Sequence, residues 1–327
     1  MKESEIRSRE THKRYLELVR ADSEKIFQDK ATFVHFPCPA CAGRDLKKLF
    51  VKDKFEYVQC ESCATVFNDP RPRFGDIQKL YRESESTKFW VNEFFMPFME
   101  ARREKIFKPR AEYIASRFPQ LLEARVGDVG AGFGLFLEEL RRIWNRARLC
   151  AIEPSEDMAA ICKSKGLEVI ESMVEDVGPQ EAAFDLLTSF ELMEHLYDPL
   201  SFLQTIHRLL NKGGLFFFTT LNGLGFDIQV LWEKSRSIAP PHHLNFFNPA
   251  SASILLQRAG FEVLEVSTPG RLDWDIVETA ASTEGVEVGK FFETLQRFGS
   301  DQAKKEFQEW ISRFSFSSHM QIVARKA

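Results

Sequence analysis

The stretch from Arg125 to Gly134, RVGDVGAGFG, constrains the fold of this chain more than any other. It has the pattern of a short apolar strand that ends in an acidic residue and three glycines, and good helix formers follow it. A strand that turns tightly into a helix leaves backbone N–H groups unblocked by side chains, so a small polar ligand can bind there. The glycine spacing differs from the GxGxxG dinucleotide fingerprint, so the ligand has to be inferred from the neighbouring segments.

From residue 125 onward, strand-like and helix-like segments alternate, which is typical of a parallel α/β sheet. We expect strands at 125–129, 148–153, 167–171, 184–189, 214–221, 261–267 and 316–325. We expect helices at 134–144, 155–165, 199–211, 249–259 and within 285–312. Acidic residues follow several of these strands, and ligands of open α/β sheets bind at the carboxyl ends of the strands.

The 327 residues allow additional domains before this sheet. Residues 1–32 read as a charged amphipathic helix, 33–72 as a cysteine-containing module, 73–122 as a helical linker or lid, and 123–327 as the α/β domain. Within the last, we expect 269–314 to be an acidic loop followed by two helices. The aromatic side chains of the helical linker either pack on a core or form a lid over the ligand; the lid candidates are Tyr81, Phe89, Trp90, Phe94 and Phe95.

Four of the six cysteines form two Cys-x-x-Cys pairs, Cys38 with Cys41 and Cys60 with Cys63, separated by eighteen residues. This spacing matches the four-cysteine zinc ribbon, and the intervening residues alternate as a hairpin does. Four thiolates would close the tetrahedron around Zn²⁺, so the metal would be structural. The alternatives are free thiols or a pair of disulfides, and a cytosolic chain disfavours disulfides.

Charge and hydropathy narrow the class of partner. The net charge of −4 does not indicate a general nucleic-acid surface. No apolar stretch is long enough to span a membrane, and the charged N-terminus has no apolar signal region. We therefore expect a cytoplasmic protein that does not bind membranes.

At this point the residues resemble a known family. The successive segments GDVGAGFG, AIEPS, EDV, FDLLTSFELMEHLYDP and LLNKGGLFFFTTLN are similar, in order and spacing, to the motifs of class I S-adenosylmethionine-dependent methyltransferases over about residues 105–268. The resemblance implies a Rossmann-like seven-stranded sheet with an antiparallel last strand, and S-adenosylmethionine as cofactor. It also implies these cofactor-binding residues: Asp128, Gly130, Ala131, Gly132, Gly134, Glu153, Pro154, Met158, Glu175, Asp176, Phe190 and Glu191. Glu153 would bind the ribose hydroxyls, Glu175 or Asp176 the adenine amine, and Phe190 and Glu191 the far side of the cofactor.

The whole layout, a cysteine ribbon ahead of such a core, is similar to methyltransferases of bacterial sugar and surface-polysaccharide pathways. That resemblance implies a small polyhydroxylated acceptor, in particular a nucleotide-sugar. Arg271, Asp273, Trp274 and Asp275 are candidate sugar contacts, with packed helices as the alternative. An RNA methyltransferase that uses its ribbon to bind RNA remains a further alternative.

Methyl transfer needs a base more than any other protein group, because the sulfonium is already activated. His195 and His243 are the candidate catalytic residues, and His242 is a weaker one, since a histidine is the natural base near neutral pH. A competing interpretation puts Glu191, Glu194 and His195 on one helix face, where with His242 or His243 they bind Mg²⁺ in a metal-assisted O-methyltransferase of a quinone or phenol.

Overall fold

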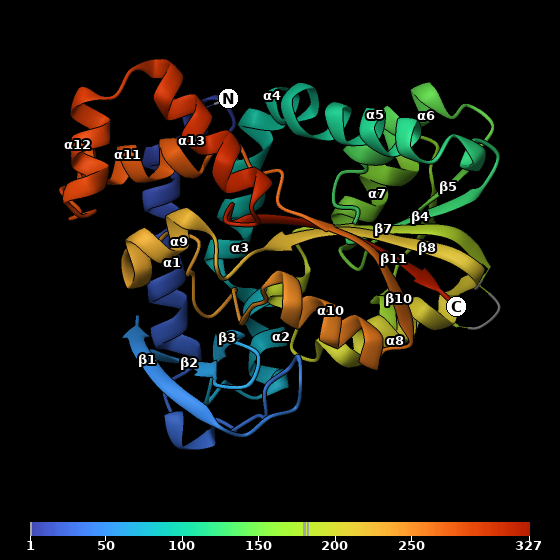
Figure 1. The fold of residues 1–327 in the computed structure, drawn as a ribbon. Coiled ribbons are helices and arrows are strands. Elements are labelled where there is room, and N and C mark those ends of the chain that lie inside the picture. Colours follow the sequence, from blue (N-terminus) through green and yellow to red (C-terminus); the bar gives the residue numbers. More distant parts are fainter. Residues whose placement is uncertain (1, 179–180, 182) are drawn as a thin grey trace. The chain divides into compact units, whose positions relative to one another are not determined.

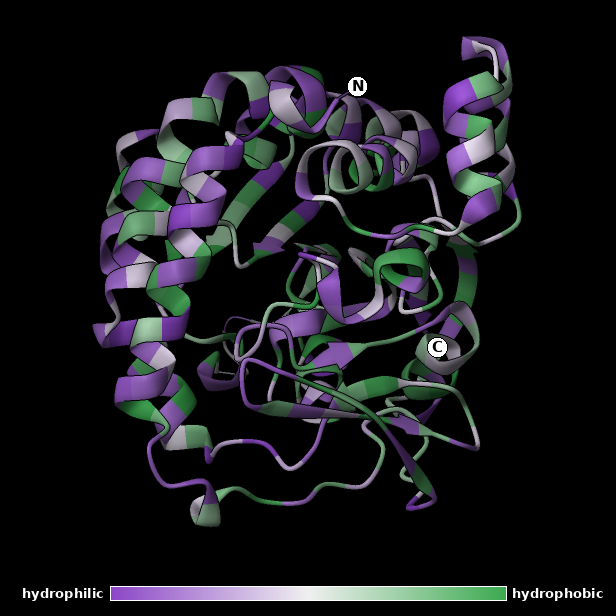
Figure 2. Cartoon of the chain, turned by 90° about the vertical axis from the view of Figure 1, so that its left-hand side faces the viewer, coloured by the Kyte–Doolittle hydropathy of each residue, from purple (hydrophilic) through white to green (hydrophobic). Residues whose placement is uncertain are grey.

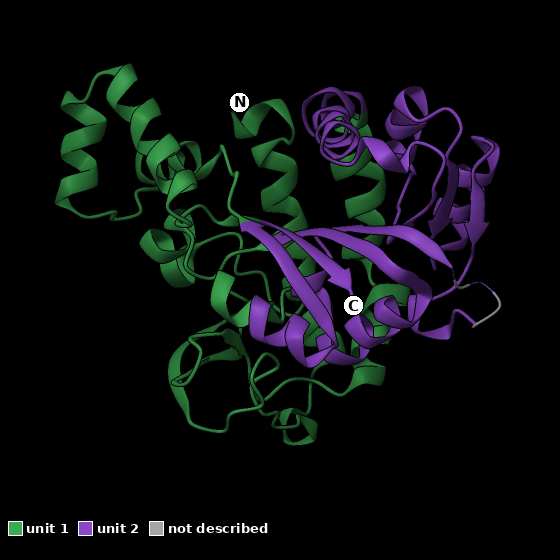
Figure 3. Ribbon diagram, turned by 45° about the vertical axis from the view of Figure 1, so that its right-hand side comes forward, with its two compact units in different colours: residues 1–99, 221–252, 267–320 green, residues 100–220, 253–266, 321–327 purple. Residues whose placement is uncertain are grey.

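A computed structural model describes residues 2–178, 181 and 183–327. The chain forms two compact units, each built from three separate segments (Figure 3). Unit 1 comprises residues 1–99, 221–252 and 267–320, and unit 2 comprises residues 100–220, 253–266 and 321–327. The segments 221–252 and 267–320 thus cluster with the N-terminal residues, although the sequence suggested a continuous 123–327 domain. The boundaries that the sequence suggested, at residues 32, 72 and 122, stay a prediction.

The expected seven-stranded sheet is present, in the order β10-β11-β8-β7-β4-β5-β6 (Figure 1). Its strands are β4 (Arg125–Val129), β5 (Arg148–Ile152), β6 (Glu168–Ile170), β7 (Phe184–Phe190), β8 (Leu210–Leu221), β10 (Phe261–Ser267) and β11 (His319–Lys326). Strands β4 to β8 pair in parallel. Near one end of β8, Asn222 N–H donates to the Ser318 carbonyl, and near the other Lys326 Nζ donates to that of Leu210. Strand β11 therefore runs antiparallel to β8, as the resemblance implied.

Both faces of this sheet are buried, and β8 shows how. Successive side chains of a strand point to opposite faces. Phe217 belongs to a cluster of buried residues on α5 (Lys108–Arg117), α6 (Leu135–Ile143) and α7 (Glu156–Ser164), whereas its neighbour Phe216 contacts Phe202 of α8 (Pro199–Leu209). Hydrophilic and hydrophobic residues alternate along the longer helices in Figure 2, as expected for helices with one buried face.

The helical linker is almost continuous. It comprises α2 (Phe74–Glu83), α3 (Glu85–Phe89), a π-helical segment (Trp90–Phe95), a 3₁₀ turn (Met96–Phe98), α4 (Met99–Arg102), a second π-helical segment (Arg103–Phe107) and α5. The 3₁₀ turn contains Pro97, and Pro109 lies in the first turn of α5 directly after the second π-helical segment. Proline lacks the N–H that an α-helix interior needs, so these local changes of helical pitch let the chain continue past both prolines.

Unit 1 contains a four-stranded sheet in the order β1-β2-β3-β9, formed by β1 (Leu46–Lys52), β2 (Phe55–Cys60), β3 (Val66–Asn68) and β9 (Asn245–Phe246). Strands β1 and β2 form the hairpin expected between the cysteine pairs. Its turn residues, Asp53 and Lys54, both have positive φ, as in the tight turns that favour hairpins.

The remaining helices of unit 1 correct one expectation. The structure has α1 (Arg9–Ile26), α9 (Phe226–Leu231), α11 (Asp273–Glu284), α12 (Lys290–Phe298) and α13 (Asp301–Arg313), and α10 (Pro249–Arg258) joins the two units. The expected acidic loop is helix α11. Its Trp274 is buried against Phe292, and its Asp273 is buried and binds Ser317 and Ser318, so these two candidate sugar contacts are core residues. Among the helices described, none is long and apolar enough to cross a bilayer.

Candidate functional site

The glycine turn follows β4 in unit 2 and has the left-handed backbone that it needs. Gly130, Gly132 and Gly134 have φ of 72°, 55° and 70°, a region in which side chains with a Cβ are strained. A Cβ on Gly132 would meet no atom within 4 Å, so the backbone there is open to a ligand. A Cβ on Gly134 would lie 2.8 Å from Leu167 Cδ1 and 3.0 Å from Cys162 Sγ, so this glycine is required for packing.

Glu153, at the carboxyl end of β5, is fixed to this turn. Its Oε2 accepts a hydrogen bond from Gly132 N–H at 2.8 Å, and its Oε1 accepts one from Ser155 N–H at 2.9 Å. The residue is buried, and desolvation raises its pKa while the two backbone bonds act in the opposite direction. Each carboxylate oxygen has a further lone pair, so both can still accept from a neighbouring diol.

Asp128 lies in β4, just before the glycine turn. Its carboxyl group is 2% exposed and accepts a hydrogen bond from Thr188 Oγ1 at 2.7 Å. Burial raises the pKa of Asp128 to about 7, because the charged form loses its hydration.

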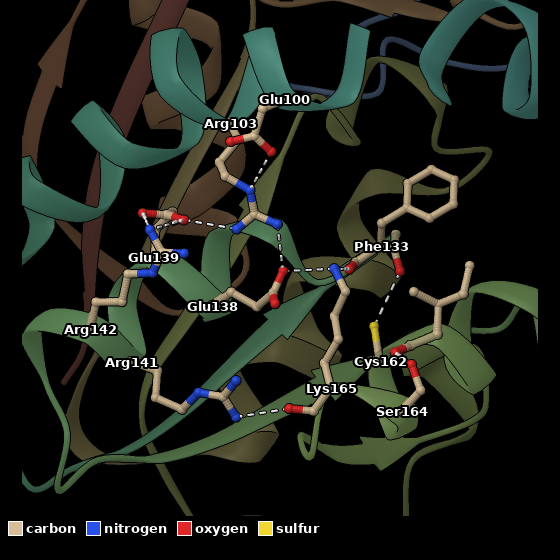
Figure 4. Close-up of polar contacts among 12 residues, drawn as sticks. Glu100, Arg103, Phe133, Glu138, Glu139, Arg141, Arg142, Cys162, Ser164 and Lys165 are labelled. Carbon is tan, nitrogen blue, oxygen red and sulfur yellow. Dashed lines mark hydrogen bonds and ion pairs between the residues drawn. The ribbon is translucent and has the colours of Figure 1, made fainter. Parts of the chain in front are cut away.

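Polar side chains behind the turn hold it in place (Figure 4). Lys165 Nζ donates to the Phe133 carbonyl at 2.7 Å and to Glu138 Oε2 at 2.6 Å. Arg103 binds Glu138 and Glu139 at 2.9 and 2.8 Å, and Cys162 Sγ lies 3.2 Å from the Gly132 carbonyl. Lys165 and Cys162 therefore link the turn to α7, and Glu138 connects Lys165 with Arg103 of the second π-helical segment.

At the carboxyl end of β7, Phe190 and Glu191 meet Arg110 of α5. The guanidinium carbon of Arg110 lies 4.2 Å from the ring centroid of Phe190, and its Nη2 lies 3.7 Å from Glu191 Oε1. Glu191 has a positive φ of 53° and accepts from Thr219 Oγ1 at 2.5 Å. Arg110 carried no motif in the sequence; a helical arginine facing a strand end has no spacing signature.

The expected helix face bearing Glu191, Glu194 and His195 is wrong. Only Met193–His195 forms a 3₁₀ turn, and Glu191 precedes it at the strand end. Glu194 is buried and accepts from Thr220 Oγ1 at 2.8 Å, whereas Glu191 binds Thr219. Because adjacent strand residues point to opposite faces, the two carboxyl groups are held by opposite faces of β8. Burial raises the pKa of Glu194, and Glu191 adds to that effect.

The other expected cofactor residues lie around the same strand ends of unit 2. Ala131 packs against the hydrophobic core, Pro154 is exposed directly after Glu153, and Met158 is half-buried in the first turns of α7. Glu175 and Asp176 are exposed in a 3₁₀ turn after β6 (Val174–Asp176).

The two candidate bases belong to different units. His195 is half-buried at the end of the 3₁₀ turn in unit 2, and its backbone N–H donates to the Leu192 carbonyl at 3.0 Å. His243 belongs to unit 1, where its Nδ1 lies 2.5 Å from the Ser237 carbonyl oxygen. An Nδ1–H donor leaves the lone pair on Nε2, which is the form a base requires. The buried His242 is the next residue, and burial lowers its pKa to about 3, which makes it a poor base.

The four patterned cysteines come together in unit 1. Their sulfur atoms all lie within 4.8 Å of one another, with 3.5 Å between Cys38 and Cys63 and between Cys41 and Cys60. All are free thiols. Sulfur ligands about 2.3 Å from a tetrahedral zinc are about 3.8 Å apart, so the cluster fits Zn²⁺. Cys150 and Cys162 are buried elsewhere.

Comparisons with known proteins identify the family of this chain. A family model described as "Methyltransferase domain" matches residues 98–266, just over half of the chain. A ubiquinone biosynthesis O-methyltransferase of Xanthomonas euvesicatoria pv. vesicatoria is 30% identical over 171 residues, which cover 48% of this chain and 70% of that protein. Its counterpart in Xylella fastidiosa is 28% identical over 215 residues, covering 59% and 84%.

Solved structures give more distant likenesses. A plantazolicin methyltransferase in complex with SAH aligns at 13% identity with a TM-score of 0.48, covering 76% of this chain and 93% of that one. A putative sarcosine dimethylglycine methyltransferase from Galdieria sulphuraria aligns at 16% identity with a TM-score of 0.44, covering 67% and 84%. The family match and the curated relatives carry the assignment: this chain belongs to the methyltransferase family and is an S-adenosylmethionine-dependent methyltransferase.

Proposed function

We propose that this chain transfers the methyl group of S-adenosylmethionine to an oxygen atom of a small hydroxylated acceptor. The observation that carries the proposal is the hydrogen bond between Gly132 N–H and the Glu153 carboxylate. This bond places an open backbone turn beside a buried carboxyl group at the strand ends. When bound, the cofactor supplies an activated methyl group, so the protein must position the acceptor and remove a proton.

We assign the cofactor contacts as follows. The turn from Gly130 to Gly134, with Ala131, holds the methionine end, and Asp128 supports it. Glu153 accepts hydrogen bonds from the ribose hydroxyls, with Pro154 and Met158 beside it. Glu175 or Asp176 accepts from the adenine amine, because both side chains are exposed in the turn after β6. Phe190 and Glu191, backed by Arg110, contact the far side of the cofactor.

We assign the base to His195 or His243. The hydrogen bond from His243 Nδ1 to Ser237 favours the tautomer with a lone pair on Nε2. The variants His195→Gln and His243→Gln show which of the two histidines takes the proton. Loss of the base lowers kcat by about a hundredfold or more and removes the acidic limb of the pH profile.

Two acceptor classes follow from different observations. The cysteine ribbon ahead of the catalytic core favours a nucleotide-activated or polysaccharide-pathway sugar. The names of the curated relatives favour a quinone-pathway phenol, and the residues matched cover 70% and 84% of those two proteins. The two classes share a ring with neighbouring hydroxyl groups, one of which would accept the methyl group.

RNA is a weaker candidate, because three of the basic side chains of the ribbon have partners within unit 1. Lys48 pairs with Glu56 and Lys54 with Glu24, and Lys52 Nζ donates to the Ser235 carbonyl at 2.6 Å. A lysine held in this way must exchange its partner before it can neutralise a phosphate.

We also propose that Cys38, Cys41, Cys60 and Cys63 bind one structural zinc ion. Four thiolates saturate its coordination, so this metal orders the ribbon and takes no part in methyl transfer. We assign no magnesium to Glu191 and Glu194 jointly, since the two are held by opposite faces of β8.

One experiment tests the central proposal. The purified chain is incubated with methyl-labelled S-adenosylmethionine and either a catechol acid or a nucleotide-sugar, and labelled product is measured. We expect label in one acceptor and tight cofactor binding by calorimetry. Cofactor binding without transfer to either acceptor would contradict the acceptor class, and the absence of cofactor binding would contradict the assigned cofactor site.

A further inference from the structure

His243, one of the two candidate bases, lies in a long loop of unit 1. Residues 235–244, all of them described by the structure, form neither helix nor strand between the 3₁₀ turn Trp232–Lys234 and β9. Most of this loop is nevertheless buried, including Ser235 and Leu244. A buried loop cannot rely on water for its backbone hydrogen bonds, so the surrounding protein has to hold its shape.

The hairpin of β1 and β2 supplies two of these hydrogen bonds. Lys52 Nζ donates to the Ser235 carbonyl at 2.6 Å, and the Tyr57 hydroxyl donates to the His243 carbonyl at 2.8 Å. The two carbonyl groups lie near opposite ends of the loop. The hairpin therefore fixes the loop at both ends.

Strand β3 and the second cysteine pair hold the residues that follow. Asn68 N–H donates to the Leu244 carbonyl at 2.9 Å, and β3 pairs with β9 as an antiparallel ladder. Asn248 Nδ2 donates to the Cys63 carbonyl at 2.9 Å. Cys63 lies in the turn between β2 and β3, so the turn that carries the second cysteine pair also holds the chain beyond His243.

Tyr57 is the ribbon residue that contacts His243 itself. Its side chain is fully buried, and the ring centroids of Phe50 and Phe246 lie 5.3 and 6.0 Å from its own. Burial raises the pKa of Tyr57, so the hydroxyl keeps its proton and remains a donor. Phenylalanine would supply the same ring packing, so what the hydroxyl adds is its bond to the His243 carbonyl.

The fixed backbone also fixes the imidazole of His243. The backbone N–H of His243 donates to the Ala239 carbonyl at 3.0 Å, and its Nδ1 lies 2.5 Å from the Ser237 carbonyl oxygen. Both acceptors belong to the loop whose ends the hairpin holds. If the His243 backbone shifts, Nδ1 moves away from the Ser237 carbonyl, and the preference for a lone pair on Nε2 is lost.

We propose that Tyr57 is a positioning residue for His243: its hydroxyl holds the His243 backbone, and the cysteine ribbon thereby sets the tautomer of the imidazole. This inference rests on the proposed function, because it is there that His243 takes a proton. All the residues concerned belong to unit 1. The ribbon then supports the reaction without contacting a reacting atom.

The test compares Tyr57→Phe with the wild-type chain, both labelled with ¹⁵N in histidine. The ¹⁵N signals of His243, assigned from the spectrum of His243→Gln, report which ring nitrogen carries the proton. We expect the Nδ1–H form in the wild-type chain and a mixture of both tautomers in Tyr57→Phe. We also expect kcat to fall by about tenfold with an unchanged Kd for S-adenosylmethionine, because a misplaced base slows the reaction and leaves the cofactor site intact.

The matched control is Tyr113→Phe, which removes a tyrosine hydroxyl from unit 2. That hydroxyl donates to Glu265 Oε1 at 3.3 Å. The control should leave both the His243 signals and kcat unchanged.

A second variant, Asn248→Asp, tests the same support if Tyr57→Phe does not fold. Its carboxylate can still accept from Ser251 N–H, but it no longer donates to the Cys63 carbonyl. The same mixture of tautomers is expected, and a wild-type spectrum of His243 would contradict the role of the ribbon.

The outcomes separate this inference from the proposed function. A changed tautomer in Tyr57→Phe supports the positioning role, even if no acceptor is methylated. If the tautomer changes and kcat keeps its wild-type value, the positioning role stands and the base is His195. An unchanged His243 spectrum overturns the positioning role, even with a lower Tm, because the hydroxyl then serves stability alone.

Discussion

The backbone N–H of Gly132 and the carboxylate of Glu153 are joined by a hydrogen bond of 2.8 Å across the ends of two neighbouring strands. This bond makes the glycine turn and the carboxylate a single structure. Changing the carboxylate therefore also changes the shape of the turn.

Replacement of Glu153 by glutamine should weaken cofactor binding. The amide NH₂ would face either Gly132 N–H or Ser155 N–H, and two donors cannot bond to each other. We expect the Kd for S-adenosylmethionine, measured by calorimetry, to rise by about tenfold to a hundredfold. Glu156→Gln, at an exposed residue nearby, is the control. Equal affinity in both variants would rule out the proposed role of Glu153.

Alanine at two glycines of the turn should have unequal effects on stability. In Gly132→Ala the new methyl group has free space, so the variant loses only the strain energy of a positive φ, about 1 kcal/mol of unfolding free energy. Gly134→Ala bears that strain and also overlaps Leu167 and Cys162, so it should cost a few kcal/mol. Denaturant unfolding of both variants measures the difference, and equal losses would contradict the packing described.

Asp128 should make stability depend on pH. Its pKa is about 7 in the folded chain and 3.8 in the unfolded one, so the folded state holds an extra proton between these values. The stabilisation is complete below about pH 4 and is lost as the pH rises through 7, a decrease of about 4 kcal/mol at most. Asp128→Asn should flatten this part of the curve. An unfolding free energy with the same pH dependence in both proteins would show that Asp128 ionises normally.

Lys165 should affect the cofactor site through the turn that it holds. In Lys165→Met, the Phe133 carbonyl and Glu138 each lose a donor. We expect weaker cofactor binding, by about threefold to tenfold, with partial rescue by Lys165→Arg. Arg141→Met is the matched control, since the exposed Arg141 donates to the Lys165 carbonyl and leaves the Lys165 side chain untouched. A change in kcat with an unchanged cofactor Kd would argue for a different role.

The cysteine cluster should contain one zinc ion per chain. Elemental analysis of the purified protein should give that ratio, and Cys38→Ser should lower it and unfold the hairpin of β1 and β2, as seen by proteolysis. Cys150→Ser, outside the cluster, should keep the metal. Zinc-free protein with intact thiols and an ordered hairpin would refute the site.

Much of the fold followed from local sequence patterns. The strand–glycine–helix stretch, the alternating segments after it and the hairpin between the cysteine pairs were all predicted correctly, because each depends on short-range periodicity and turn chemistry. The acidic segment at Asp273 was not, because its charges suggested a surface loop while Trp274 and Val277 pack into a core.

The surroundings of the site were harder to predict. Arg110 and Lys165 act through contacts with residues far along the chain, and no spacing rule identifies such contacts. Glu191 and Glu194 have helical spacing, yet the strand ends at Glu191 with a positive φ, so the spacing indicated the wrong structure.

The position of β11 has a consequence for synthesis on the ribosome. Strand β11, residues 319–326, lies between β8 and β10, so neither of those strands has its final neighbour until the ribosome has made the preceding 318 residues. Strands β4 to β8 can pair earlier, during translation. Until β11 arrives, the edge of β8 is open to pairing with other chains, and a nascent chain of this protein would benefit from a chaperone at that stage.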